Sequence, residues 1–343
     1  MRKIAIIGID IAKDVFQIHA VDKCGALVTK RKLARREVLP YFRRLSACAV
    51  GIEACGTAHH WGRALAKLGH HVKLMSPGYV KPYVKSQKND AADAEAICEA
   101  MQRPNMRFVP LKSVEQQAMV SLHTARNLLT RQQTMLVNAC RGCLSEFGIV
   151  GAAGHAGLSG LLRELQKGSV KKLPPSARAA VKALTDQLQA AKTQIRLIDF
   201  QIRVWHRAHA ESRRLETIPG VGVITATALA AAVPDPHQFR SGRGLAAWLG
   251  LVPRQFSSGG KTRLGHITKR GNTRLRSLLV LGARQVIWRV RRGGASPYAG
   301  LRELMARKPF WVAVVALASK MARVVWALLM KEETFHARRE AHA

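Results

Sequence analysis

Residues 4–9 form a nearly uninterrupted apolar run that leads directly into an acid, Asp10. A short run of this kind is typical of a central strand that is buried on both faces of a sheet. Asp10 then falls where the strand leaves the core. Because a strand buried on both faces needs helices over the sheet, this run predicts an α/β domain at the start of the chain.

The residues that follow predict a regular order of strands and helices. The expected strands are residues 4–9, 15–20, 26–30, 47–54 and 71–75. Helices are expected after the third, fourth and fifth strands, the last two at residues 59–68 and 90–101. Asn89 or Asp90 is expected to cap the last helix. This order of elements is that of the ribonuclease H superfamily.

Four carboxylates stand at the ends of these expected elements: Asp10, Glu53, Asp90 and Asp93. Asp90 and Asp93 are three residues apart, so they share one face of their helix. Acids gathered this closely stay ionised only beside cations, and Mg²⁺ prefers carboxylates combined with water and phosphate oxygens. The set therefore predicts a metal site. The alternative for each acid alone is a strand end, a helix cap or a solvated side chain.

The charge of the chain indicates the class of its partners. There are 56 Lys and Arg residues against 21 Asp and Glu residues, which gives a formal net charge of +35. Such an excess goes beyond what solubility needs and favours binding to the phosphate backbone of nucleic acid. The basic residues are densest between Arg254 and Lys308, where Glu303 is the one acid. A merely solvated basic face does not account for the whole excess.

No membrane or secretory segment is expected. The chain starts with strand-like sequence immediately after two basic residues, and the apolar residues 310–330 are interrupted by Lys320 and Arg323. A buried amphipathic helix is the expected structure there. Cys140 and Cys143 form an isolated C-x-x-C, which favours core thiols in a reducing cytoplasm over a zinc site.

The middle of the chain has the period of long helices. An a/d pattern runs from Val181 to Trp205, and a similar one, broken at Gln132, runs from Leu122 to Cys143. A Gly, Ser and Pro-rich stretch at residues 148–176 separates them and is expected to form a tip or mobile arm. The two helices could pair with each other or with another subunit, so this segment is interpreted as a spacer and oligomerisation element.

The C-terminal part opens with a glycine pattern at residues 217–222. It is typical of a helix-hairpin-helix, in which Gly220 and Gly222 allow backbone amides to approach a phosphate. A purely structural helix-loop-helix is the alternative.

A second glycine-rich segment, residues 250–272, contains Ser258 beside two glycines. A serine in such a loop can approach and attack a phosphodiester, and cations can stabilise the developing charge. An ordinary Ser-Gly loop remains open, and His266 is a candidate base. The expected nucleic-acid contacts of the segment are Arg254, Lys261, Arg263, Lys269, Arg270 and Arg276.

Taken together, these motifs resemble the DEDD-type insertion-sequence transposases. The resemblance rests on residues 8–10, 51–53, 88–93, 250–253, 257–260, 267–272 and 275–276, in order over nearly the whole chain. It implies a RuvC-like ribonuclease-H-fold catalytic domain at residues 1–111, a helical coiled-coil spacer at residues 112–208, and a mostly helical transposase domain at residues 209–343.

The resemblance also implies a mechanism. Members of the family excise and insert their own element, guided by a structured non-coding RNA that pairs with donor and target DNA. By their motifs, Asp10, Glu53, Asp90 and Asp93 bind two Mg²⁺ ions, with Mn²⁺ as a substitute, and Ser258 is the nucleophile, although Ser257 adjoins it. The acids and the serine are implied to meet across subunits of a dimer that assembles into a tetramer, in the bacterial cytoplasm and at the nucleoid.

Two other functions fit the residues. The chain could be a metal-dependent Holliday-junction-type resolvase that uses no covalent serine step, with the serine segment only gripping DNA. It could also be a non-catalytic nucleic-acid scaffold with a degenerate nuclease fold, although the complete set of acids argues against this.

Overall fold

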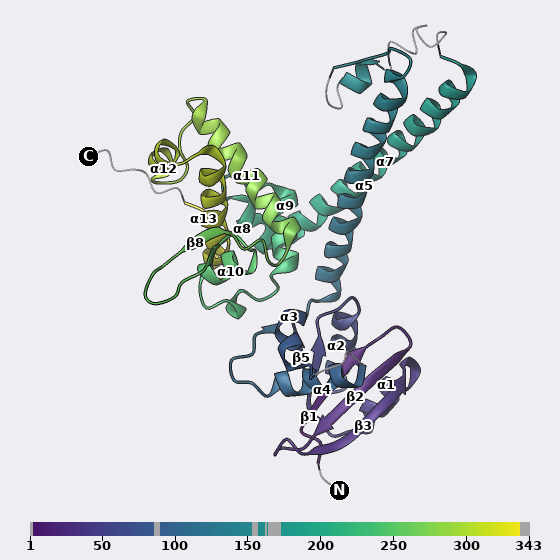
Figure 1. Ribbon diagram of the computed structural model, residues 1–343, viewed down its shortest axis with the longest axis vertical. Coiled ribbons are helices and arrows are strands. Elements are labelled where there is room, and N and C mark those ends of the chain that lie inside the picture. Colours follow the sequence, from purple (N-terminus) through teal and green to yellow (C-terminus); the bar gives the residue numbers. More distant parts are fainter. Residues whose placement is uncertain (1–2, 86–89, 153–156, 162, 164–172, 337–343) are drawn as a thin grey trace. The chain divides into compact units, whose positions relative to one another are not determined.

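The computed structural model describes residues 3–85, 90–152, 157–161, 163 and 173–336 (Figure 1). The chain divides into two compact units. The first consists of residues Met1–Val114 and Val233–Arg240, and the second of residues Glu115–Ala232 and Ser241–Ala343.

The first unit contains a six-stranded mixed sheet with the strand order β3-β2-β1-β4-β5-β6. Its strands are β1 (Ile6–Ile11), β2 (Val15–Val21), β3 (Leu27–Ala34), β4 (Ala49–Glu53), β5 (His71–Met75) and β6 (Phe108–Val109). β1 is antiparallel to β2 and parallel to β4, and Ile9 pairs with Ile52. This register brings the next residues, Asp10 and Glu53, to the same edge of the sheet.

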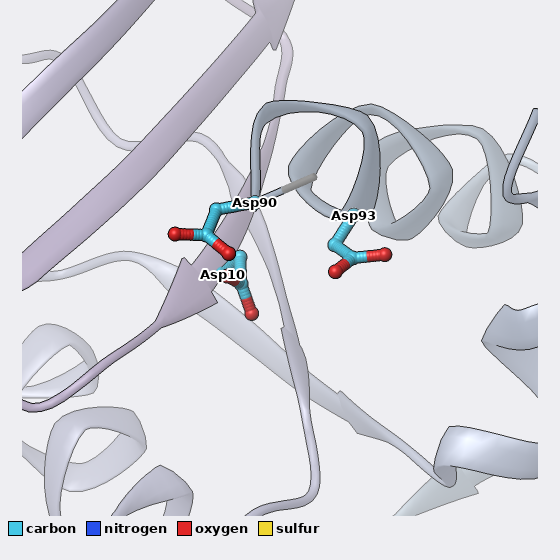
Figure 2. A group of neighbouring side chains, drawn as sticks. All are labelled: Asp10, Asp90 and Asp93. Atoms are coloured by element: carbon cyan, nitrogen blue, oxygen red, sulfur yellow. The ribbon is translucent and has the colours of Figure 1, made fainter. Parts of the chain in front are cut away.

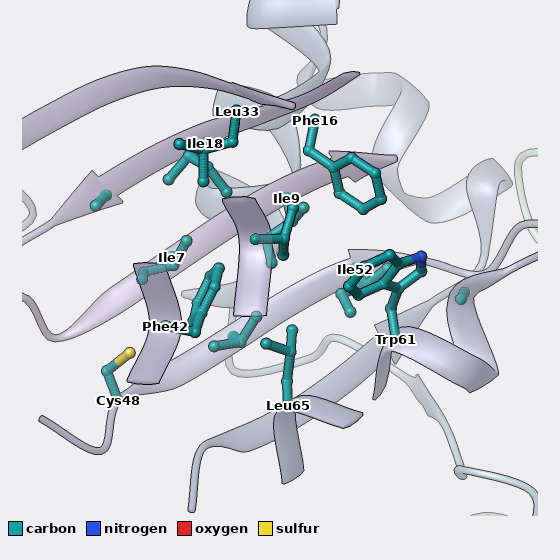
Figure 3. Close-up of a cluster of buried hydrophobic side chains, with 14 of the residues drawn as sticks. Ile7, Ile9, Phe16, Ile18, Leu33, Phe42, Cys48, Ile52, Trp61 and Leu65 are labelled. Atoms are coloured by element: carbon teal, nitrogen blue, oxygen red, sulfur yellow. The ribbon is translucent and has the colours of Figure 1, made fainter. Parts of the chain in front are cut away.

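Helices cover both faces of this sheet. They are η1 (Arg35–Glu37), α1 (Val38–Arg43), α2 (Ala58–Ala66), α3 (Pro77–Val80), η2 (Lys81–Tyr83) and α4 (Asp90–Met101). On one face Ile7 and Ile9 pack in a buried cluster with Phe42 of α1 and Leu65 of α2 (Figure 3). A second cluster joins Ile97 and neighbouring residues of α4 to Met75 of β5.

A glycine lets helix α4 lie directly on β1. A Cβ atom at Gly8 would come within 2.2 Å of the backbone oxygen of Ala94, so only glycine permits this approach. Because side chains alternate along a strand, Asp10 lies on the same face as Gly8. The helix contact therefore brings the first turn of α4 toward Asp10.

The mixed sheet and its helices are compatible with the expected ribonuclease-H-like domain. Several strand ends differ from expectation by one or two residues, and β3 continues four residues further, to Ala34. Strand β6 was not expected. β3 extends because Val15 of β2 still pairs with Ala34, and an edge strand tolerates the exposed cations that mask its sequence signal.

The described part of the second unit is helical apart from one hairpin. Its elements are α5 (Val114–Ser145), α7 (Pro175–Ala208), α8 (Ala210–Glu216), α9 (Val223–Ala232), α10 (Gly242–Trp248), β7 (Pro253–Gln255), β8 (Leu264–Ile267), α11 (Thr273–Arg291), α12 (Leu301–Arg307) and α13 (Phe310–Lys331). A short 3₁₀ helix, η4 (Pro236–Gln238), precedes α10 in the chain and belongs to the first unit.

The two long helices α5 and α7 lie side by side in the same chain (Figure 1). Val137 and Leu144 of α5 share a buried cluster with Val181 and Leu188 of α7. Nearer their other ends, Arg126 and Asp199 form an ion pair with 2.5 Å between Nε and Oδ1. Part of the predicted seam on α7 is therefore buried within the chain. Of the predicted tip, residues 148–176, residues 153–156, 162 and 164–172 lie outside the described residues.

Helix α13 forms part of the core of the second unit. Among the described residues it is the one helix long and apolar enough, by length and composition, to cross a membrane. Half of its most apolar window is buried inside the protein, where Val314, Leu317 and Met321 are inaccessible or nearly so. This burial is the arrangement expected for the apolar residues 310–330.

Candidate metal centre and nucleic-acid interface

Three of the predicted acids meet at one edge of the sheet. Asp10 follows the buried part of β1, and Asp90 and Asp93 lie in the first turn of α4 (Figure 2). One carboxylate oxygen from each lies within 4.8 Å of the others. Carboxylate oxygens at this spacing suit a hard divalent cation such as Mg²⁺. Asn89, the alternative cap, lies outside the described residues.

The electrostatics of Asp10 show how close these charges are. Its pKa is raised from the ordinary value of 3.8 to about 6, first by burial and then by the negative charges of Asp93, Asp90 and Glu53. A hydrogen bond from the backbone of Ile11 acts in the opposite direction. Glu53 is thus near enough to affect Asp10 although it is outside the group of three. A cation at this position would relieve the repulsion.

Glu95 holds helix α4 to its surroundings. Its carboxylate accepts hydrogen bonds from Lys30 Nζ of β3 at 2.9 Å and from Lys85 Nζ at 3.0 Å. These hydrogen bonds, the one from Lys30 first, lower the pKa of Glu95 to about 2. The sequence does not single out Glu95, because nothing in a helical pattern separates an acid that binds two lysines from a solvated one.

The predicted serine segment forms the hairpin β7–β8. Gly259 and Gly260 have φ angles of +55° and +76°, and the amide of Lys261 donates to the carbonyl of Ser258 at 3.0 Å. Two central residues with positive φ make a tight hairpin turn whose twist matches that of the strands. Glycine at both positions adopts these φ angles without steric strain.

The two serines differ in their surroundings. The Ser257 hydroxyl oxygen accepts from Gln255 Nε2 at 3.0 Å and from the backbone amide of Arg263 at 3.3 Å. Ser258 is exposed, and within the described part of the chain no hydrogen bond engages its hydroxyl. Ser258 is therefore the more accessible of the two.

Five of the predicted cationic contacts are exposed around this hairpin: Arg254, Lys261, Arg263, Lys269 and Arg270. Their side chains are available to phosphates in solution. His266, the candidate base, is also exposed.

Arg276 lies in a different environment, because only 9% of its surface is exposed. Its guanidinium donates to the carbonyls of Leu249 at 3.0 Å and Arg270 at 2.9 Å, and to the Thr273 hydroxyl at 3.1 Å. Arg276 thus holds together the two ends of the segment that carries the hairpin. Its geometry is that of a positioning residue, a role that the sequence could not separate from phosphate binding.

The two glycines of the predicted helix-hairpin-helix also differ. Gly220 has a φ of +89° and packs against helix α11, where a Cβ at Gly282 would come within 2.0 Å of the Gly220 carbonyl oxygen. Gly222 is exposed, and no atom lies within 4 Å of the Cβ it lacks. Only Gly222 leaves its backbone open on the side where a phosphate could approach.

An acidic cluster at the edge of a mixed sheet, in a chain with a net charge of +35, defines the class of enzymes that process nucleic acid. Comparison with known protein families identifies which of these enzymes the chain resembles. The family model described as Transposase IS116/IS110/IS902 family matches residues 212–299, and the model of the DEDD transposases of IS110 matches residues 7–149.

Full-length relatives agree with these matches. The chain is 47% identical over 330 residues to a probable family 20 transposase of Pseudomonas aeruginosa, which covers 96% of this chain and 98% of the relative. It is 40% identical over 335 residues to the transposase for insertion sequence element IS1111A of Coxiella burnetii, which covers 98% of this chain and 92% of the relative. The chain belongs to the DEDD-type insertion-sequence transposases, which confirms the resemblance found in its motifs.

Proposed function

We propose that this protein excises and inserts its own DNA element by a reaction that uses both the acidic cluster and a serine nucleophile. The observation that carries the proposal is the meeting of Asp10, Asp90 and Asp93 within 4.8 Å in a member of a transposase family. We assign Asp10, Glu53, Asp90 and Asp93 as ligands of two Mg²⁺ ions, for which Mn²⁺ can substitute. When bound, such ions polarise a phosphate and stabilise the charge that develops on it.

Ser258 is our candidate nucleophile. Its hydroxyl oxygen would attack the phosphorus of a DNA phosphodiester, lose its proton, and form a serine–phosphate ester, while the bond from phosphorus to the leaving sugar oxygen breaks and that oxygen takes up a proton. The accessible Ser258 hydroxyl and the engaged Ser257 hydroxyl support this choice. The exposed cations of the hairpin would stabilise the negative charge on the phosphate in the transition state.

Substrate binding is assigned to the exposed cations and to the open backbone at Gly222. Arg254, Lys261, Arg263, Lys269 and Arg270 would contact DNA phosphates, and Arg276 would keep their segment in place. The family resemblance adds donor and target DNA, a structured guide RNA, and a homo-oligomer built from dimers. It also suggests action at the nucleoid, and the division into a RuvC-like domain (1–111), a spacer (112–208) and a transposase domain (209–343).

Trapping of the covalent intermediate tests the mechanism. Protein incubated with element-end DNA and Mg²⁺ is denatured and analysed for DNA joined to protein, and the modified residue is identified by mass spectrometry. Wild-type protein and Ser257→Ala are expected to form the adduct, whereas Ser258→Ala and Asp10→Asn are expected to bind DNA without forming it.

The same experiment separates the alternatives. Strand cleavage by Ser258→Ala with no adduct would support the metal-only resolvase instead, and absence of cleavage by the wild type under all conditions would support a scaffold. In a mixture of Ser258→Ala and Asp10→Asn, recovery of activity would support an oligomer, because a mixed assembly contains intact copies of both sets of residues.

A further inference from the structure

Aromatic and arginine side chains gather where the C-terminal end of α11 meets the N-terminal end of α13. We call this set the aromatic-arginine patch; it consists of Trp288, Arg291, Arg292, Phe310 and Trp311. The guanidinium carbon of Arg292 lies 3.9 Å from the centre of the Trp288 ring, and that of Arg291 lies 4.7 Å from the centre of the Phe310 ring. The rings of Phe310 and Trp311 meet edge to face, with 5.2 Å between their centres.

The two tryptophans of the patch are directed to solvent rather than to the core. Trp288 is 50% exposed and Trp311 is 59% exposed. The inner face of α11 is formed by other residues, such as Ala283 and Ile287, which are fully buried. Leaving so much aromatic surface in water gives up the free energy that its burial would contribute. Large exposed aromatic side chains of this kind are typical of binding surfaces.

The charges around the patch select its partner. Basic residues precede and follow it along the chain, and Glu303 is the one acid between Arg284 and Lys308. If the same patch of a second copy faced this one, arginine would stand against arginine, which is unfavourable. The partner must therefore be anionic and must also offer flat apolar faces to the tryptophans and guanidinium groups. Nucleic acid has both properties.

The exposed rings of Trp288 and Trp311 can stack only on bases that are unpaired and unstacked. In a duplex the faces of the bases are covered by their neighbours, whereas in a single strand each base can stack on an aromatic ring while cations follow the backbone. Since the family acts on DNA, we propose that the aromatic-arginine patch binds a single-stranded segment of DNA. Bases stack on Trp288 and Trp311, and Arg291 and Arg292 contact both base faces and phosphates.

This site is separate from the hairpin that carries Ser258. Helix α11 begins at Thr273, immediately after the hairpin segment, and at a rise of 1.5 Å per residue Trp288 lies about 22 Å further along it. The patch could therefore hold a strand that has separated from the duplex while the hairpin cations hold another part of the DNA. The inference does not depend on the assignment of Ser258 or of the acids.

Binding of labelled oligothymidine to the full-length protein, followed by fluorescence anisotropy, tests the proposal. Trp288→Leu keeps apolar bulk but removes the aromatic face, and is expected to weaken binding about tenfold. Trp288→Phe is expected to retain most of the affinity, and Arg292→Lys to lose part of it because a lysine cannot stack as a guanidinium does. Binding of a blunt duplex is expected to stay unchanged in all three variants.

A matched control is Phe200→Leu on α7, where another aromatic side chain is 65% exposed. Its affinity for oligothymidine is expected to equal that of the wild type, and melting curves establish that each variant is folded. Equal affinity of Trp288→Leu and wild type would overturn the proposal, as would a Trp288→Phe variant as weak as Trp288→Leu. Tighter, Trp288-dependent binding of oligouridine than of oligothymidine would overturn the assignment to DNA.

Discussion

Replacement of Asp10 by Asn is expected to stabilise the metal-free protein while abolishing its activity. At neutral pH the ionised Asp10 carboxylate is partly buried and repelled by Asp90, Asp93 and Glu53. Asparagine has nearly the same shape but no charge, so it removes both the desolvation cost and the repulsion. On this prediction, Asp10 serves catalysis while its charge lowers the stability of the metal-free fold.

The pKa of Asp10 sets the size and the pH range of this effect. A rise from 3.8 to about 6 corresponds to at most about 3 kcal/mol of destabilisation once the group is ionised. Since Asp10 is only partly buried, solvent screening reduces this to about 1–2 kcal/mol. The folded state binds the proton more tightly than the unfolded state. The extra free energy of unfolding of Asp10→Asn over the wild type is therefore nearly absent below pH 4, grows between pH 4 and 6, and is constant above pH 6.

Urea denaturation in EDTA at several pH values measures this gain directly. Asp14→Asn is the control, because Asp14 is an exposed acid outside the group of three and its replacement is expected to change stability little. Addition of Mg²⁺ is expected to stabilise the wild type but not Asp10→Asn. The two proteins then differ less in their free energy of unfolding. A variant that is no more stable than wild type at pH 8 in EDTA would refute the reasoning, and so would a gain that is the same at pH 4 and pH 8.

Three further predictions follow from other parts of the structure. The pKa of His123 is lowered to about 4, first by burial and then by the charges of Arg274 and Arg126. The wild type should therefore lose about 2–3 kcal/mol as pH falls from 6.5 to 4, and an equally steep acid limb in His123→Gln denaturation curves would contradict this. Lys261→Ala should reduce the slope of log DNA affinity against log salt concentration by about one unit, the effect of one lost phosphate contact, without changing DNA sequence preference. An unchanged slope would exclude a phosphate contact at Lys261. Leu188→Lys should destabilise the α5–α7 pair by about 3 kcal/mol or more, because Leu188 is 3% exposed in their shared cluster, and an unchanged melting curve and oligomer size would show that the seam has no such role.

Local pattern predicted the strands around the acidic cluster well. β5 and α4 have the predicted bounds, and β1, β2 and β4 differ by one to two residues at their ends. The apolar run ending in Asp10 and the spacing of Asp90 and Asp93 are properties of a few neighbouring residues. For this reason they could be recognised without knowledge of the rest of the chain.

What could not be predicted depends on contacts between distant residues. Strand β6 is two residues long and exists because Val109 pairs with Leu74. Arg276 has the same sequence surroundings as the exposed cations, and its burial follows from hydrogen bonds that include one to the carbonyl of Leu249, 27 residues away. The exposure of Trp288 likewise depends on which face of α11 is turned to the core, and Ala283 and Ile287 occupy that face.

The contact between Gly220 and Gly282 restricts how this chain can vary in the course of evolution. In most cores a larger residue on one side can be accommodated by a smaller one opposite, so the two positions drift together. Here a Cβ at Gly282 would meet the Gly220 carbonyl, and a Cβ at Gly220 would come within 2.9 Å of the Gly282 carbonyl. Every amino acid has that carbonyl, so no second substitution at the facing position can compensate the first. The two sites are therefore expected to remain glycine in any descendant that keeps this crossing of loop and helix.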